Sequence, residues 1–283
     1  MDTNTKPVVL GYDGSREADG ALRGAVDLAR RHEWPLRVVV ARGDLHRLSS
    51  WADEWTHGLA EEWVQSAAKL LAELGATATE IDIRDGMAAP VLVEESADAA
   101  CVVVGALGHG ALVGRLQGSV SQHVSRHAAC PVLVVRDGGS PQGPVVAGAD
   151  GSTASLEALE FALHEAGLRE CRLDIVYAPQ HINGYGVGDP GGVGVAVDLL
   201  RVLRAHDEHV LAEVAAVVAD HPGVAVDVRT VDGSPARELV RASKQAALVV
   251  VGSHGAGAFE GMLLGSVSAA VLRRAHCPVA VIR

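Results

Sequence analysis

The stretch CVVVGALG at Cys101–Gly108 returns 147 residues later as LVVVGSHG at Leu248–Gly255. In both places an apolar run rich in valine leads directly into a glycine, two further residues and a second glycine. Short, continuous apolar runs are typical of parallel strands that are covered on both faces. The stretch therefore indicates a buried strand followed by a glycine-containing loop, and it indicates that the chain carries this unit twice.

The duplication extends over the whole chain. The segment VVLGYDGS at Val8–Ser15 matches VVAGADGS at Val145–Ser152, and Gly118–Arg136 matches Gly265–Arg283 at 12 of 19 positions. The distance between matching residues grows from 137 to 147, so the second copy has ten more residues between its second and third strands. We expect the glycine-rich segment Asn183–Gly194 to belong to this longer loop.

Within each copy, apolar runs alternate with helical patterns, which predicts right-handed βαβ units and a parallel sheet. The expected fold class is α/β, with two tandem doubly wound domains at 1–136 and 145–283 and a linker at 137–144. In the first copy we expect strands near Val8–Tyr12, Leu36–Ala41, Thr79–Arg84, Cys101–Gly105 and Val132–Arg136, and helices near Ser15–His32, Trp51–Leu74, Ala88–Ala97 and Ser119–Ala128.

Composition argues against several classes of protein. The formal net charge is −11 and no basic run occurs, so we expect no nucleic-acid binding. No apolar run reaches the length of a membrane span and the first residues lack the apolar core of a signal peptide, so we expect a cytoplasmic protein. The 4 cysteines form no CxxC pair and the 13 histidines no HExxH motif, so we expect buried, reduced thiols and no metal site.

An aspartate stands where ligands of open α/β sheets bind, beyond the carboxyl end of a strand. Asp13 and Asp150 end the first strand of their copies and precede Gly-Ser and a helix. Each carboxylate can accept hydrogen bonds from ribose hydroxyls or an adenine amine. Each can also form an Asx turn that starts the helix, with Ser15 or Ser152 as the N-cap. These residues alone favour the turn.

The loop after the fourth strand carries a stronger signal, the pattern G-x2-G-x9-G-S in both copies. The first two glycines would let the backbone approach a sugar, and the Gly-Ser pair opens a helix whose N-terminus attracts phosphate. Because the pattern occurs twice at equivalent places, it favours nucleotide binding over simple turns. The candidate contacts are Gly105, Gly108, Gly118, Ser119 and Ser121, with Gly252, Gly255, Gly265, Ser266 and Ser268 in the second copy.

The sequence offers little for catalysis. It contains neither a P-loop lysine motif nor a G-x-S-x-G nucleophile elbow, so we assign no catalytic residue. Arg115 lies in the first glycine loop, as does His109. Glu260 lies in the second loop, where its charge would oppose a triphosphate, which favours tighter binding at the first site.

These motifs, together with the closing HAACPVLVVR at His127–Arg136, resemble the ATP-binding universal stress proteins, over nearly the whole chain and in two copies. The resemblance implies five parallel strands per domain in the order 3-2-1-4-5, and pairing of two domains or two subunits through their last strands. It places adenine and ribose contacts on Asp13 and Asp150. It places the phosphate contacts of ATP, bound with Mg²⁺, on Gly108, Gly118, Ser119 and Val120, and on Gly255, Gly265, Ser266 and Val267. Leu107 departs from the family pattern, because many relatives carry a basic residue there.

The leading functional hypothesis is a stress-response regulator in which bound ATP changes dimerisation or the choice of a protein partner that the sequence does not name. Two alternatives stay open. One is a slow ATPase that uses the same site, and the other is a nucleotide-free interaction scaffold.

Overall fold

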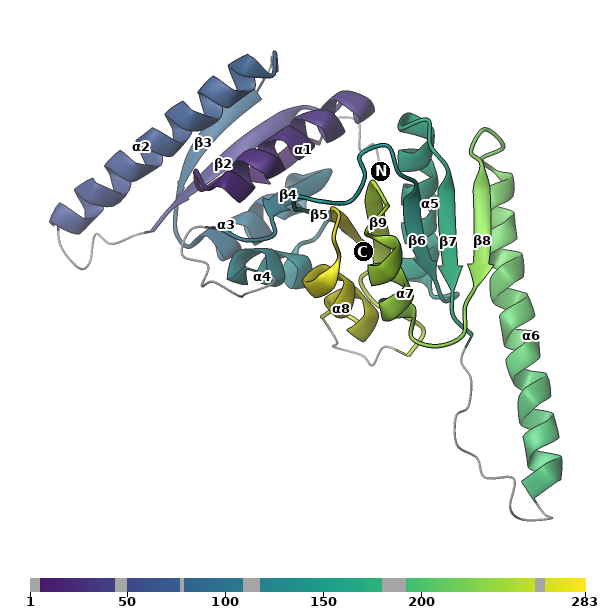
Figure 1. Ribbon diagram of the computed structural model, residues 1–283. Coiled ribbons are helices and arrows are strands. Elements are labelled where there is room, and N and C mark those ends of the chain that lie inside the picture. The colour runs from purple at the N-terminus through teal and green to yellow at the C-terminus, as the bar shows by residue number, and fades with distance from the viewer. Residues whose placement is uncertain (1–5, 44–49, 77–78, 109–117, 180–191, 258–262) are drawn as a thin grey trace.

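A computed structural model describes residues 6–43, 50–76, 79–108, 118–179, 192–257 and 263–283. In these residues ten strands form one sheet, in the order β3-β2-β1-β4-β5-β10-β9-β6-β7-β8 (Figure 1). The strands are β1 (Val8–Gly11), β2 (Leu36–Arg42), β3 (Thr79–Asp85), β4 (Cys101–Gly105), β5 (Val132–Val135), β6 (Val145–Ala149), β7 (Leu173–Tyr177), β8 (Val226–Thr230), β9 (Leu248–Gly252) and β10 (Val279–Ile282). The helices are α1 (Arg16–His32), α2 (Ser50–Glu73), α3 (Ala88–Glu95), α4 (Ser119–His127), α5 (Thr153–Leu168), α6 (Gly192–Ala219), α7 (Pro235–Ala242) and α8 (Ser266–Arg274).

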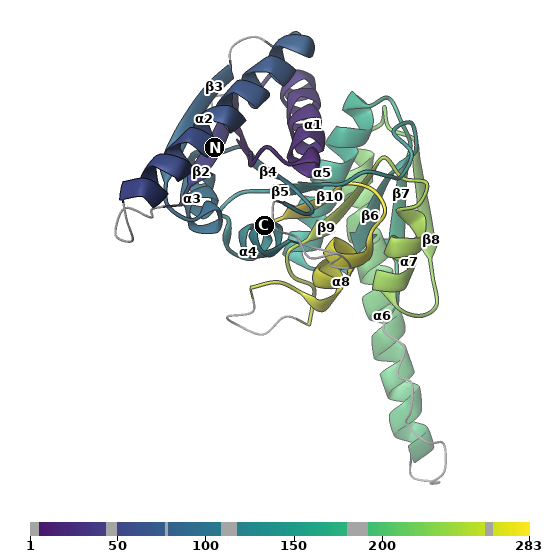
Figure 2. The ribbon, with the colours of Figure 1, turned by 60° about the vertical axis from the view of Figure 1, so that its left-hand side comes forward.

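Each copy has the strand order 3-2-1-4-5, and all pairings inside a copy are parallel, as predicted. The two copies join through β5 and β10, which run antiparallel with Leu133 opposite Ala280 (Figure 2). Pairing through the last strands, which the resemblance implied, therefore occurs within this chain.

The helices cover the sheet in two layers that both extend over the two copies. One apolar core lies between the sheet and α1, α2, α5 and α6, and the other lies between the sheet and α3, α4, α7 and α8. The side chains that α1 and α5 bury are largely alanine and leucine, for example Ala21, Leu22, Ala158 and Leu159. Small side chains let the helices approach the valine-rich strands closely, so the sequence fills both cores with few aromatic residues.

The segment 137–144 is not a loose connection, because three of its glycines lie against the second copy. A Cβ atom on Gly139 would lie 2.5 Å from the Ala246 carbonyl oxygen, and one on Gly143 would lie 1.9 Å from the Gln245 carbonyl oxygen. The Ser140 N–H donates to the Ala246 carbonyl at 3.0 Å. Only glycine fits at these close approaches, so the linker is tied to the second copy from Gly138 onward.

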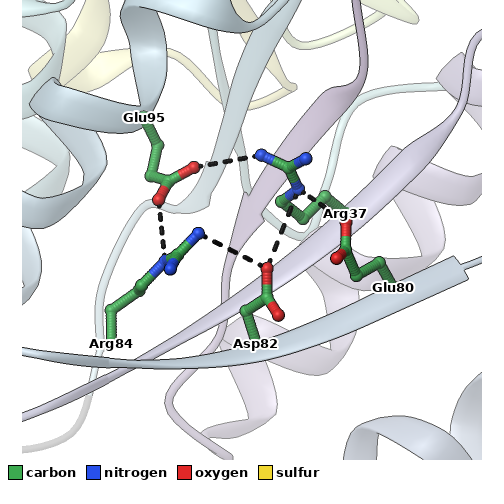
Figure 3. Close-up of polar contacts among 5 residues, drawn as sticks. All are labelled: Arg37, Glu80, Asp82, Arg84 and Glu95. Atoms are coloured by element: carbon green, nitrogen blue, oxygen red, sulfur yellow. Dashed lines mark hydrogen bonds and ion pairs between the residues drawn. The ribbon is translucent and has the colours of Figure 1, made fainter.

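The end of the sheet at β3 carries a network of five charged side chains (Figure 3). Arg37 on β2 lies 3.0 Å from Glu80 and 3.8 Å from Asp82, both on β3, and 3.3 Å from Glu95 on α3. The fifth member, Arg84 on β3, lies 2.9 Å from Glu95 and 3.6 Å from Asp82.

The opposite end of the sheet repeats the arrangement with fewer members. Arg229 on β8 lies 2.8 Å from Asp227 and 3.3 Å from Asp174 of β7, and Arg172 lies 2.5 Å from Asp174. Charged side chains on an edge strand disfavour pairing with the strand of another molecule. Both ends of the sheet are therefore protected by ion pairs.

A buried carboxylate joins the two copies on the α1 and α5 side. Glu165 of α5 is fully buried, and its oxygens lie 2.5 Å from the His32 imidazole of α1 and 2.9 Å from Arg169. Arg31 lies 4.0 Å away, and the His32 ring stacks on Trp34 with centroids 4.0 Å apart. This contact links residues 133 positions apart in the chain.

One prediction on the longer loop needs correction. Gly192, Val193 and Gly194 lie in the first turn of α6, whereas the sequence analysis placed them in the loop. The rest of that segment, 183–191, lies outside the described residues. The N-terminal part of α6 extends well beyond the sheet (Figures 1 and 2), so the extra length of the second copy goes partly into a helix.

The thiols are free and mostly buried, as expected. Burial raises the pKa of Cys130 to about 11 and that of Cys277 to about 12, so both stay protonated at neutral pH. Among the helices of the described ranges, none has the length and apolar character needed to cross a membrane.

Candidate functional site

The turn between β1 and α1 is built around Asp13. Its Oδ1 accepts from the Ser15 N–H at 3.1 Å and from the Ser15 hydroxyl at 2.6 Å. The Ser15 Oγ in turn accepts from the Ala18 N–H at 3.1 Å, which caps the helix. Gly14 has a φ of +72°, a conformation that side chains disfavour. The Asx turn that the residues alone favoured is therefore present.

The second copy repeats this turn. Asp150 Oδ1 accepts from the Ser152 N–H at 3.0 Å and from its hydroxyl at 2.6 Å, and Ser152 caps α5 through the Ser155 N–H at 3.2 Å. The other oxygen, Oδ2, accepts from the Ala256 N–H at 3.0 Å. The aspartate thus holds the loop after β9 against the start of α5.

Close neighbours explain why the first two fixed positions of each G-x2-G-x9-G-S loop hold glycine. A Cβ atom on Gly108 would lie 2.6 Å from Asp13 Oδ2, and one on Gly255 would lie 2.3 Å from Asp150 Oδ2. A Cβ atom on Gly252 would lie 2.7 Å from the main chain of Ala154 in α5. The main chain of Ala154 excludes a side chain at Gly252, and a side chain at Gly108 or Gly255 would have to displace the aspartate. These glycines therefore serve the packing of the loop against the aspartate and the helix. The close approach of these glycines to a sugar, which the sequence pattern predicted, stays a prediction.

The third glycine has a different environment. Gly118 and Gly265 are the N-caps of α4 and α8, with ordinary φ values of −77° and −68°. An added Cβ would meet its nearest neighbours only at 3.3 and 3.4 Å. A glycine cap offers no side-chain oxygen to the N–H groups of the first turn, whereas the serine caps of α1 and α5 do. The first turns of α4 and α8 therefore present N–H groups to whatever lies in front of them.

The serines of these helices divide into two kinds. Ser121 and Ser268 are buried, and their hydroxyls donate to the carbonyls of Ala106 at 3.1 Å and Gly252 at 2.6 Å. They hold the first turn against the end of the fourth strand. Ser119 and Ser266 are exposed at the N-terminus of their helices. A ligand there would meet the exposed pair first.

All fourteen predicted site residues line two equivalent pockets. The first pocket has a volume of about 150 Å³ and the second about 710 Å³. The first contains Asp13, Gly105, Gly108, Gly118, Ser119, Val120 and Ser121. The second contains Asp150, Gly252, Gly255, Gly265, Ser266, Val267 and Ser268. The structure therefore brings the predicted residues of each copy together.

Part of the pocket lining was not predicted from the sequence. Ala88 and Leu92 of α3 close the first pocket, and Ser234 and Pro235 at the start of α7 line the second. These residues follow the third strand of each copy. Because ligands bind beyond the carboxyl ends of the strands, the rule that located the aspartates could have located them as well.

A family model described as the Universal stress protein family matches residues 4–136 and 143–283, one match in each copy. The chain belongs to this family. It is a tandem universal stress protein that is 34% identical to the universal stress protein Rv2623 of Mycobacterium tuberculosis, over 98% of this chain and 96% of that protein.

Solved universal stress proteins have the same fold. The alignment with a universal stress protein from Archaeoglobus fulgidus covers 100% of this chain and 99% of that chain, with a TM-score of 0.69 and 21% sequence identity. A second structure, of a protein from Pseudomonas aeruginosa, covers 99% of this chain and 93% of its own, with a TM-score of 0.63 and 17% identity.

The pockets of this universal stress protein hold few charges. Neither lysine nor arginine stands among the described residues that line them, and histidine appears only in the second, as His206 and His254. No group of three metal-ligating side chains occurs in the described part of the chain. Arg115, His109 and Glu260, which the sequence analysis placed in the loops, lie outside the described residues.

A tyrosine lines each pocket and is held by a carboxylate. The Tyr12 hydroxyl donates to Asp19 at 2.7 Å, and the Tyr177 hydroxyl donates to Asp207 of α6. Burial and the hydrogen bond to the carboxylate raise the pKa of both phenols well above the usual value. Both stay protonated at neutral pH, and each keeps a fixed orientation beside the aspartate of the site.

Proposed function

We propose that this universal stress protein binds an adenine nucleotide, ATP with Mg²⁺, in each of its two pockets, and that occupancy regulates its dimerisation or its binding to a protein partner. The observation that carries the proposal is the pair of glycine-capped helix N-termini, at Gly118 and Gly265, that open into pockets beside an aspartate. N–H groups and the positive dipole end of a helix bind phosphate without a lysine or arginine.

In this arrangement the phosphates lie at the first turns of α4 and α8, on the main-chain N–H groups and the hydroxyls of Ser119 and Ser266. Asp13 and Asp150 line the same pockets, where a carboxylate can accept hydrogen bonds from ribose hydroxyls. Because the described lining carries no fixed cation, the charge of a triphosphate needs Mg²⁺ as a counterion. Binding should therefore depend strongly on the metal.

The same chemistry favours slow turnover. Helix N–H groups stabilise bound phosphate as well as a transition state, and uniform binding does not raise the rate of reaction. Fast phosphoryl transfer adds a positioned lysine or arginine and a residue that orients water. We expect hydrolysis below roughly one per minute, against a median enzyme turnover of about 10 per second.

Mass spectrometry of the nucleotide released from freshly purified, denatured protein tests the proposal. ATP in the released fraction supports a nucleotide-binding regulator. ADP alone supports the ATPase, and an empty fraction with no heat on titration with millimolar ATP and Mg²⁺ supports the scaffold. Sedimentation with and without ATP then tests whether occupancy changes the dimer population. The double variant Gly118→Val and Gly265→Val is the control that lacks both sites.

A further inference from the structure

One arginine of each copy reaches into the other copy at the junction of the sheet. Arg136 follows β5, and its guanidinium donates to the carbonyls of Ala275 at 2.9 Å and Leu272 at 2.5 Å. Arg283 follows β10, and its guanidinium donates to the carbonyl of Ser125 at 2.8 Å. The two arginines occupy equivalent positions in the repeat, because Arg136 and Arg283 are the last residues of the matching segments Gly118–Arg136 and Gly265–Arg283.

Their acceptors lie at the ends of the two site helices. Leu272 and Ala275 lie in the last turn and C-cap of α8, and Ser125 lies in the last turn of α4. Neither helix ends in glycine; the C-caps are Ala128 and Ala275. The last carbonyls of a helix have no partner inside it, so the guanidinium of the other copy supplies donors that a glycine-based cap would otherwise provide.

Holding these charges at the junction is costly, which indicates that they have a role there. Burial lowers the pKa of both Arg136 and Arg283. The Nε atoms of both are buried, and each lacks a hydrogen-bond partner within the described part of the structure. Each arginine thus gives up hydration for contacts with one helix end, and the duplication has kept both.

The opposite ends of these helices form the two pockets. Each helix has nine residues, about 13 Å at 1.5 Å per residue, so support at one end reaches the other. We propose that Arg136 and Arg283 are positioning residues that couple each nucleotide site to the opposite copy: Arg136 supports the site of the second copy, and Arg283 supports the site of the first.

This inference rests on the proposed function, and single-site proteins test it. Gly118→Val leaves only the second site, and Gly265→Val leaves only the first. Arg136→Met should weaken Mg-ATP binding at the second site about fivefold and at the first less than twofold; Arg283→Met should show the reverse. Arg136→Lys, which keeps the charge, should restore part of the affinity. Arg273→Met, an exposed change at the end of α8, is the matched control and should have no effect.

Hydrogen exchange without nucleotide gives a second readout. Arg136→Met should speed exchange along α8 but not along α4, and Arg283→Met should speed it along α4 but not along α8. Equal effects on both sites and both helices, or no effect on either, would overturn the coupling. If the single-site parents bind no ATP, the proposed function fails, while the exchange pattern still decides whether the support crosses between the copies. Where a methionine variant does not fold, the lysine variant is measured in its place.

Discussion

The two copies have the same main-chain elements at the candidate site, but the side chains packed around these elements differ. Both have the Asp-Gly-Ser turn, a glycine under the aspartate and a glycine-capped helix. Around that frame the packing differs, since Trp63 of α2 lies against Gly14 in the first copy, whereas Val210 of α6 lies against Gly151 in the second. The pockets have volumes of about 150 and 710 Å³.

The copies also differ where they meet. The buried Glu165 of α5 stands at the position that the buried Leu28 holds in α1, 137 residues earlier. A carboxylate in one copy and a leucine in the other allow a contact between α1 and α5 that two identical copies would not make. Duplication has kept the main-chain geometry of the proposed phosphate contact and has changed the side chains around it.

The largest effect should come from breaking this unequal contact. Glu165→Gln would leave His32, Arg31 and Arg169 without their carboxylate, and breaking a buried pair costs about 3–5 kcal/mol. Denaturant unfolding should show that loss. Glu160→Gln, exposed on the same helix, is the control; a loss under 1 kcal/mol at position 165 would mean that the contact does not hold the copies together.

The same contact should make stability depend on pH. Burial alone would raise the pKa of Glu165, but the hydrogen bond from His32 and the charges of Arg169 and Arg31 outweigh it and lower the pKa. A lowered carboxyl pKa contributes stability above the unfolded value, about pH 4.3, and that stability is lost as the pH falls further. Burial, and then the charge of His32, lower the pKa of His164, so the unfolded state takes up its proton first below about pH 6.5. Melting temperatures should therefore fall from pH 7 to pH 4, and Glu165→Gln should flatten the part below pH 5.

The shared frame is tested by Gly118→Val and Gly265→Val. Each places a branched side chain at the first turn of a site helix, where we expect the phosphate, and should weaken ATP binding at its own site by about 100-fold, or roughly 2.7 kcal/mol. Titration calorimetry on each variant should report one remaining site. Gly223→Val is the matched control, since an added Cβ there meets no atom within 4 Å. Unchanged binding in both variants would contradict the site.

Asp13→Asn and Asp150→Asn should behave alike, because the turn is the same in both copies. Hydrogen bonds to a charged group contribute about 1.5–3 kcal/mol, so each variant should lose stability and also weaken its own site. Thermal unfolding and titration measure the two effects. A strong effect in one copy only would show that the shared geometry hides different roles.

The smallest effect concerns the unequal pockets. Ligand pockets usually hold roughly 300–1,000 Å³, so we expect the first pocket to widen when it admits ATP, at a cost that lowers its apparent affinity. We expect the second site to bind about tenfold more tightly, or roughly 1.4 kcal/mol. Single-site affinities measure the ratio. The negative charge of Glu260 in the second loop favours the opposite order of affinities. Tighter binding at the first site would therefore mean that this charge affects affinity more than the pocket volume does.

Much of the fold follows from the sequence. The valine runs and the repeat predicted every strand of the first copy to within one or two residues, and the resemblance supplied the strand order. The site residues were found because they share a strand end or a helix start. Local patterns do not reveal which neighbouring atoms require a glycine at a given position. Gly108 lies against Asp13 and Gly252 lies against Ala154, and both neighbours come from distant segments of the chain.

The contacts between the two copies could not be predicted from local sequence patterns either. His32 and Glu165 look like any charged pair on two helices until the sheet brings them together. Arg136 and Arg283 did carry a signal, since both are in the matched segments that end each copy. That signal acquires a meaning only when β5 and β10 are paired.

The antiparallel join between β5 and β10 has a consequence for how such a protein can change over generations. When two separate subunits pair through this strand, one gene encodes both sites, and every substitution appears in both. A linker that holds the halves together at a high effective concentration makes pairing independent of expression level. Each half can then accumulate its own substitutions, such as leucine at position 107 and histidine at the equivalent position 254. One half is then free to diverge while the other keeps its sequence.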